Sequence, residues 1–149
     1  MKIYILALVA VLAVVSCKKK EVVTTTTSSA TTTSVTTPIV SAGFKWTENG
    51  GAEITADSSR FSAQYKTLFA FKGSKMFEIN LSGSSVATYN IGTANALTLV
   101  SGGANNAATA GDVKISANAS SKISGTFDVT MNTGGLTNVK GLFIDVAVK

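Results

Sequence analysis

The sequence predicts an all-β protein, a single antiparallel β-sandwich or small meander barrel of about eight or nine strands after a disordered tether. Three observations predict this class. From residue 43 onward apolar and polar residues alternate, which is typical of half-buried strands. Clusters of Gly, Asn and Ser separate these short runs, and the chain has 13 Gly but a single Pro. The 149 residues leave room for one domain, which we place at residues 43–149.

Residues 1–16 have the pattern of a cleaved leader. Met1-Lys2 precedes an unbroken apolar run from Ile3 to Val15. This run suits the hydrophobic region of a signal peptide and is shorter than the roughly 20 residues that a membrane-spanning helix needs. We therefore expect cleavage between Ser16 and Cys17.

The end of the leader, Val14-Val15-Ser16-Cys17, resembles a bacterial lipobox. This resemblance implies a diacylglyceryl group on the Cys17 thiol and an acylated new N-terminus. Several acyl chains would hold the protein to a membrane far more firmly than one chain. We expect a cell-envelope location, at the outer membrane, and no disulfide, since Cys17 is the single cysteine.

Residues 17–42 are expected to form a disordered tether. Lys18, Lys19 and Lys20 follow the anchor, and Thr24–Thr37 is almost wholly Thr and Ser. Such a segment buries too little apolar surface to offset its ordering entropy.

The domain is expected to be built from short strands, of which Ile123–Met131 has the clearest alternation. In the last strand we expect Leu142, Ile144, Val146 and Val148 to share one buried face. One segment, Ser58–Lys66, has the pattern of a helix with Asp57 as N-cap. The other expected strands are Phe44–Thr47, Glu53–Ala56, Thr67–Lys72, a run through Phe77, Ile79 and Leu81, Val86–Ile91, Ala96–Val100 and Val113–Ala117.

Two glycines interrupt the expected strands. Gly125 and Gly141 weaken pairing unless a bulge or a close approach requires them. We expect a bend there, with Phe127 or Phe143 covering the gap.

The net charge of +5 does not indicate nucleic-acid binding. From Gly43 onward nine basic residues face seven acidic ones, a net of +2, with no basic stripe between aromatics. No nucleic-acid partner is expected.

The residue types exclude most catalytic designs. The chain has no histidine and its one thiol is expected to be lipidated, so Ser-His-Asp catalysis, Cys-His catalysis and common zinc sites are excluded. We expect no enzyme activity, no metal and no cofactor. Carboxylates are present, but solvated strand faces are favoured over a glycosidase pair, with Asp145 opposite Lys122. These carboxylates are Glu53, Asp57, Glu78, Asp112, Asp128 and Asp145.

Trp46, Tyr65 and Tyr89 form a candidate stacking platform for a ligand such as a sugar. Core packing is the favoured alternative for Trp46, which would plug one end of a barrel. Gly43-Phe44-Lys45-Trp46 is similar to the Gly-x-Trp motif of lipocalins, with the spacing longer by one residue.

Four segments together resemble a family of small Bacteroidota lipoproteins catalogued only as a domain of unknown function. The likeness covers most of Gly43 to Lys149 and carries no catalytic residue. These segments are Phe44–Gly51, Phe77–Leu81, Ile123–Phe127 and Val139–Phe143.

The expected function is that of a membrane-anchored, non-enzymatic module that binds a protein or glycan. Two alternatives stay open: a lipocalin-like carrier of a small apolar ligand, and a carboxylate-dependent hydrolase.

Overall fold

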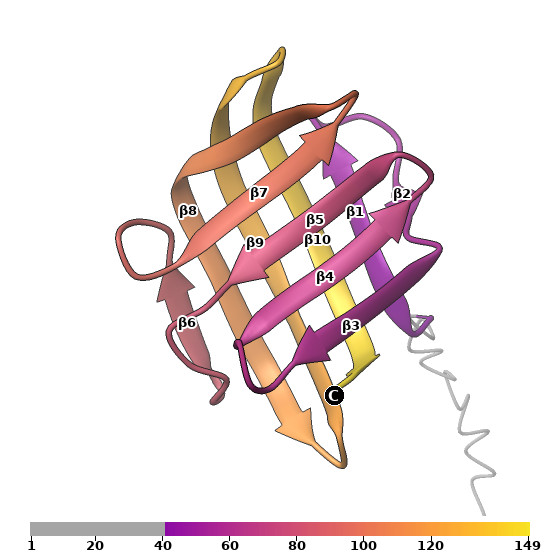
Figure 1. The fold of residues 1–149 in the computed structure, drawn as a ribbon, viewed down its shortest axis with the longest axis vertical. Coiled ribbons are helices and arrows are strands. Elements are labelled where there is room, and N and C mark those ends of the chain that lie inside the picture. Colours follow the sequence, from indigo (N-terminus) through magenta and orange to yellow (C-terminus); the bar gives the residue numbers. More distant parts are fainter. Residues whose placement is uncertain (1–40) are drawn as a thin grey trace, which may run out of the picture. The chain divides into compact units, whose positions relative to one another are not determined.

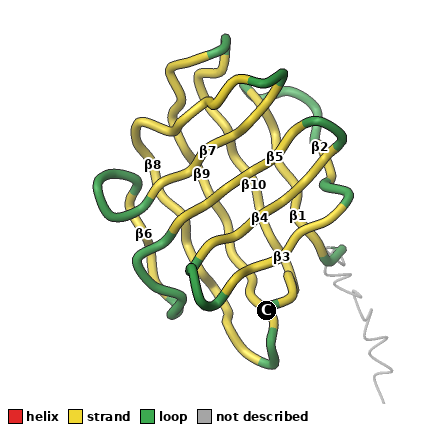
Figure 2. Tube along the Cα trace, viewed as in Figure 1, coloured by secondary structure: helices red, strands yellow, loops and turns green. Residues whose placement is uncertain are grey.

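The computed structural model describes residues 41–149. The leader expected at residues 1–16, the lipidation site at Cys17 and the tether up to residue 40 lie outside the described residues. Within residues 41–149 every regular element is a strand (Figure 2). This part of the chain contains no helix long and apolar enough to cross a bilayer.

The fold class is confirmed: the described residues form ten strands joined by antiparallel pairing. The order across the sheet is β2-β1-β10-β9-β8-β7-β5-β4-β3, and β6 pairs with β8. The strands are β1 (Gly43–Glu48), β2 (Ile54–Thr55), β3 (Ser58–Ser62), β4 (Thr67–Lys72), β5 (Lys75–Asn80), β6 (Ala87–Asn90), β7 (Ala96–Ser101), β8 (Ala104–Ala119), β9 (Lys122–Thr133) and β10 (Leu136–Ala147).

The sheet curls into a half-barrel because one long strand takes part in both of its layers. Residues 104–107 of β8 pair with β7, whereas residues 108–119 pair with β9. A register shift between Ala108 and Ala110 interrupts the second pairing, next to Gly111 with its φ of 112°. Such an irregularity bends a strand and increases its twist. As a result β3, β4, β5 and β7 lie across β1, β8, β9 and β10 in Figure 1.

β3 contacts the last residues of the chain at one isolated bridge. Phe61 forms a parallel bridge with Val148. The amide of Lys149 donates to the carbonyl oxygen of Phe61 at 2.8 Å, and the amide of Ala63 donates to that of Lys149 at 2.9 Å. The free edge of β3 is therefore occupied at this point.

Aromatic rings that pack against one another fill the space between the two layers. The ring of Phe77 on β5 lies 5.1 Å from Phe44 and 5.0 Å from Trp46, both on β1. Phe127 on β9 stacks on Phe44 at 5.3 Å. These centroid distances are typical of favourable aromatic pairs. Side chains from both layers thus form one packed core.

The two strand glycines are covered as the sequence predicts. Phe143 lies directly opposite Gly125, and Phe127 directly opposite Gly141. In each case a Cβ on the glycine would collide with the opposing ring and with a backbone carbonyl of the other neighbouring strand. Register shifts lie beside Gly125 in both of its pairings, as the expected bend requires. The bend expected at Gly141 is wrong, because pairing there continues unbroken on both sides.

The expected helix at Ser58–Lys66 is wrong. The segment forms β3 and the turn into β4, because Ser58–Ser62 pairs in register with Thr67–Phe71. Phe61 is buried and Tyr65 is exposed, so the two do not share a face. Asp57 caps no helix; its carboxylate accepts hydrogen bonds from Lys72 Nζ at 2.6 Å and from the Gly73 amide at 3.1 Å.

The expected buried face of the last strand is wrong for Leu142 and Ile144 but right for Val146, and Val148 packs against the core. Phe143 is buried in β10, whereas Leu142 and Ile144 are partly exposed on the outer face. A register shift between Phe143 and Val146 then reverses the alternation, and Asp145 adopts a φ of 52° within it. Val146 therefore faces the core although Ile144 does not.

Candidate functional site

The structure does not bring together the three aromatics of the candidate stacking platform. Trp46 is 2% exposed and lies in the core, and Tyr89 is 8% exposed. The Tyr89 hydroxyl donates to the carbonyl oxygen of Ser85 at 2.9 Å. Only Tyr65, which is 69% exposed, can offer its ring face to a ligand.

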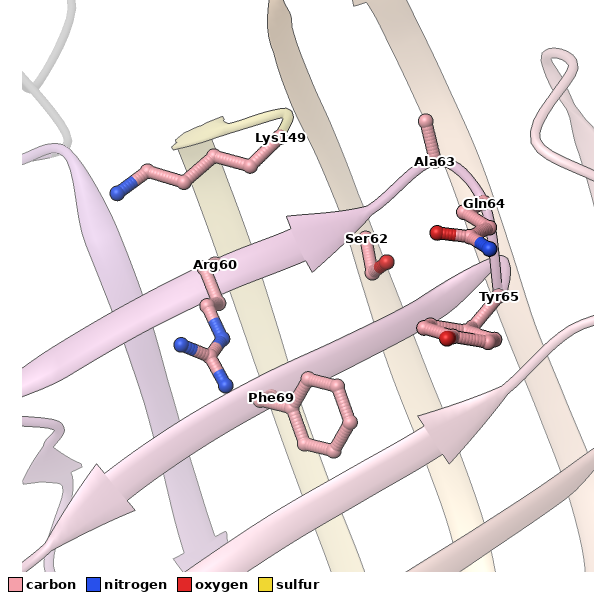
Figure 3. Close-up of a pocket in the computed structure, with 7 residues that line it drawn as sticks. All are labelled: Arg60, Ser62, Ala63, Gln64, Tyr65, Phe69 and Lys149. Carbon is pink, nitrogen blue, oxygen red and sulfur yellow. The ribbon is translucent and has the colours of Figure 1, made fainter.

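Tyr65 borders an open surface hollow of about 610 Å³ at the β3–β4 hairpin. Strand alternation builds this hollow: Phe61 faces the core, so its neighbours Arg60 and Ser62 face outward. Phe69 on β4 pairs with Arg60 and faces the same side. The lining residues are Arg60, Ser62, Ala63, Gln64, Tyr65, Phe69 and Lys149 (Figure 3).

Arg60 is the most distinctive polar group in the hollow. Its Cζ atom lies 5.4 Å from the centre of the Phe69 ring, a cation–π contact worth about 0.5–1 kcal/mol at an exposed site. Within residues 41–149 it takes part in none of the five ion pairs. The Phe69 ring therefore orients the guanidinium group of Arg60, and the N–H groups of Arg60 remain available to bind a ligand.

The turn that carries Tyr65 is tied to the rest of the domain. Thr67 Oγ1 lies 3.0 Å from the Tyr65 carbonyl oxygen and 2.7 Å from Asn80 Oδ1. Lys66 adopts a φ of 53°, its ammonium donates to the Ser82 carbonyl oxygen at 3.0 Å, and its own carbonyl accepts from Leu81. These contacts tie the turn to β5 and to the segment that follows it.

A second hollow, of about 250 Å³, lies on the outer face of β1 and β10. Its charged groups include Lys45 and Glu53, which pair with each other at 3.0 Å. Lys140, also in its lining, pairs with Asp128 at 2.7 Å. Because these charges are already neutralised, this hollow is a weaker candidate than the first.

Five carboxylates of the described domain each pair with a lysine. The expected contact between Asp145 and Lys122 is present at 3.3 Å. Asp112 lies inside β8, directly opposite Asp128. The pairs are Lys45–Glu53, Lys72–Asp57, Lys75–Glu48, Lys122–Asp145 and Lys140–Asp128.

Glu48 forms the most buried of these pairs. It accepts hydrogen bonds from Trp46 Nε1 at 2.8 Å and from Lys75 Nζ at 2.6 and 2.8 Å, and so links β1 to β5. Partial burial opposes ionisation of Glu48. The hydrogen bonds from Lys75 and Trp46 and the charge of Lys75 outweigh it, so the pKa of Glu48 lies below its usual value.

Two exposed carboxylates have pKa values that are lowered by hydrogen bonds. The pKa of Asp57 is lowered by Lys72 first and by the Gly73 amide second. The pKa of Asp128 is lowered by Lys140 first and by Asn138 second. Each group is held ionised, which is the opposite of what a general acid needs near neutral pH. Within residues 41–149 no three His, Cys, Asp or Glu side chains gather as a metal site.

Sequence patterns indicate Tyr65 as a ligand contact but not Arg60 or Phe69. The signal for Arg60 is the alternation of Arg60, Phe61 and Ser62, which becomes visible once the segment is read as a strand. Phe69 has no comparable signal, because Leu68, Phe69 and Ala70 are all apolar and their alternation does not reveal which face is buried.

Comparisons of this chain with protein-family models, with curated proteins and with solved structures found no match.

Proposed function

We propose that this protein is a lipid-anchored, non-enzymatic binding module of the bacterial cell envelope, placed at the outer membrane, and that the hollow at the β3–β4 hairpin contacts a protein or glycan partner. The lipobox at Val14–Cys17 and the likeness to small Bacteroidota lipoproteins support the anchor. One observation carries the binding role: an exposed tyrosine ring lines the same hollow as an arginine that contacts the Phe69 ring and has no ion-pair partner within residues 41–149.

The aromatic packing favours surface binding over the carrier alternative. A carrier of a small apolar ligand needs interior space that side chains leave open. Here Phe44, Trp46, Phe77 and Phe127 lie against one another between the layers, with ring centroids 5.0 to 5.9 Å apart. A ligand in that place would have to displace them.

The ionisation of the carboxylates favours binding over hydrolysis. Glycosidase chemistry needs one carboxyl group that stays protonated near neutral pH. The three carboxylates with shifted pKa values, Glu48, Asp57 and Asp128, are all shifted toward the ionised form. Their lysine partners also occupy the oxygens that a substrate would need.

Site-specific photocrosslinking in intact cells tests this proposal. A photoreactive residue replaces Tyr65 in the full chain, and the control carries it at Val86, which is exposed to a similar extent, 63% against 69%. We expect position 65 to give an adduct of defined composition that is absent at position 86. No adduct at position 65, or the same adducts from both positions, would contradict a binding role for the hollow.

A further inference from the structure

The chemistry of the hollow narrows the class of its ligand. Its lining combines an exposed tyrosine ring, a guanidinium group, a hydroxyl on Ser62 and an amide on Gln64. An aromatic face stacks on the C–H face of a sugar ring, while hydroxyl and amide groups exchange hydrogen bonds with sugar hydroxyls. A volume of about 610 Å³ lies in the range common for sites that bind small molecules or a few residues of a chain.

The charge of the lining points to an anionic ligand. Arg60 is basic, and within residues 41–149 no Asp or Glu side chain lines the hollow. The carboxylate opposite Phe69 in the sheet, Glu78, accepts a hydrogen bond from Asn80 at 3.1 Å and makes no ion pair with Arg60. A guanidinium group presents its N–H donors in a fork that matches a carboxylate. Arg60 therefore has an unused site for a carboxylate group.

The backbone around the hollow argues against an extended peptide. Peptides bound beside a sheet usually pair with a free strand edge. The edge of β3 at Phe61–Ala63 already pairs with Val148 and Lys149. In Figure 3 the side chains of Arg60, Phe69 and Tyr65 extend over the hairpin, so contacts there must come from side chains.

We infer that the hollow binds a carboxylate-bearing sugar of an acidic polysaccharide, a uronic acid. One sugar ring of the polysaccharide stacks on Tyr65, and a carboxylate of the same chain pairs with Arg60, whose guanidinium group lies over the Phe69 ring. This inference rests on the proposed function and names its ligand class.

Calorimetric titration of the full chain in detergent tests the inference. The probes are oligosaccharides of galacturonic, glucuronic and mannuronic acid, each beside its methyl-esterified, uncharged counterpart. We expect at least one acidic series to bind at least tenfold more tightly than its ester. Added salt should reduce this difference, because the ion pair is exposed to solvent.

Matched variants assign the binding to the hollow. We expect Arg60→Gln to weaken binding at least tenfold. Lys114→Gln removes the same charge from β8, outside the hollow, and should change affinity less than twofold. Tyr65→Ala should weaken binding strongly, whereas Val86→Ala should not. Tyr65, Val86 and Lys114 are exposed, so their variants should keep the unfolding midpoint of the parent chain. Arg60 is also exposed, and Arg60→Gln should lose only the small contribution of its contact with Phe69.

Several results would overturn the inference. These are equal affinity for acids and esters, no binding of any uronic acid series, unchanged affinity in Arg60→Gln, or tighter binding of an acidic peptide of equal charge. If photocrosslinking from position 65 still gives its specific adduct, the proposed binding role stands and only the ligand class is wrong. If neither adduct nor binding is found, both fail.

Discussion

Gly125 and Gly141 each lie opposite a phenylalanine whose ring occupies the space where a side chain would be. Glycine in a strand normally weakens it through lost packing and added backbone entropy. Here the rings of Phe143 and Phe127 restore the packing, a device also used in designed sheets. The two glycines therefore leave room for the rings of Phe143 and Phe127.

Gly141→Ala should lower the free energy of unfolding by about 1–3 kcal/mol, because the new methyl group overpacks the sheet. The methyl would meet the ring of Phe127 and the carbonyl oxygen of Lys45. Gly92→Ala is the control, since a Cβ there has nothing within 4 Å and needs no unusual φ. Urea denaturation measures both. Equal stability of the two variants would show that the strand can move to admit the methyl group.

The Glu48 contact makes stability depend on pH. Its pKa in the folded protein lies below the ordinary value of 4.5, so folding favours the ionised form. This contribution is fully present above pH 4.5 and is lost as the pH falls through the lower, folded value. Glu48→Gln should reduce the loss of stability at acid pH. At pH 7 it should lower the free energy of unfolding by about 1–2 kcal/mol, because a charged hydrogen-bond acceptor is lost.

Urea unfolding between pH 3 and 7 checks this prediction. Steps of roughly half a pH unit resolve the titration of a single group. Asp145→Asn is the matched control, because the ion pair of Asp145 with Lys122, at 3.3 Å, is exposed to solvent. If the parent and Glu48→Gln lose stability equally as the pH falls, the pH dependence comes from groups other than Glu48.

At the level of the element, β10 shows how one irregular residue changes which side chains form the core. Up to Phe143 the odd-numbered positions Val139 and Phe143 face inward. The irregularity at Asp145, with its φ of 52°, moves Val146 to the inner face. A bulge adds one residue to one strand and so reverses the alternation beyond it.

Phe143→Ala and Leu142→Ala separate this phase from the one predicted from the sequence. Phe143 is buried, so its truncation should cost about 3–5 kcal/mol. Leu142 is partly exposed on the outer face, so its truncation should cost less than about 2 kcal/mol. Urea denaturation of both variants under the same conditions shows which variant loses more stability. A larger loss for Leu142→Ala would mean that the aliphatic stripe faces the core.

On the scale of the whole molecule, a packed β domain follows a chain segment that carries the expected anchor. Cys17 lies in that segment, outside the described residues. Cys17→Ala should abolish lipidation and move the protein from the membrane fraction to the soluble fraction, because acyl chains supply the membrane affinity. Mass spectrometry of the N-terminus measures this. An unlipidated parent chain would remove the anchor from the proposed function.

Local sequence was sufficient for the all-β class, for most strands, and for the covered glycines. Alternation and turn residues act over a few neighbours, so they can be read directly along Ile123–Met131. Local sequence also indicated Tyr65 as a candidate contact for a ligand.

The tertiary structure decided β3, the phase of β10 and the neighbours of Tyr65. Ser58–Lys66 fits a helix in isolation, and only pairing with β4 makes Ser58–Ser62 a strand. Arg60 meets Phe69 because of that pairing, nine residues away in the chain. The bridge between Phe61 and Val148 likewise joins β3 to residues far from it in the sequence. Register between distant segments is set by the packing of the whole core, which no local pattern encodes.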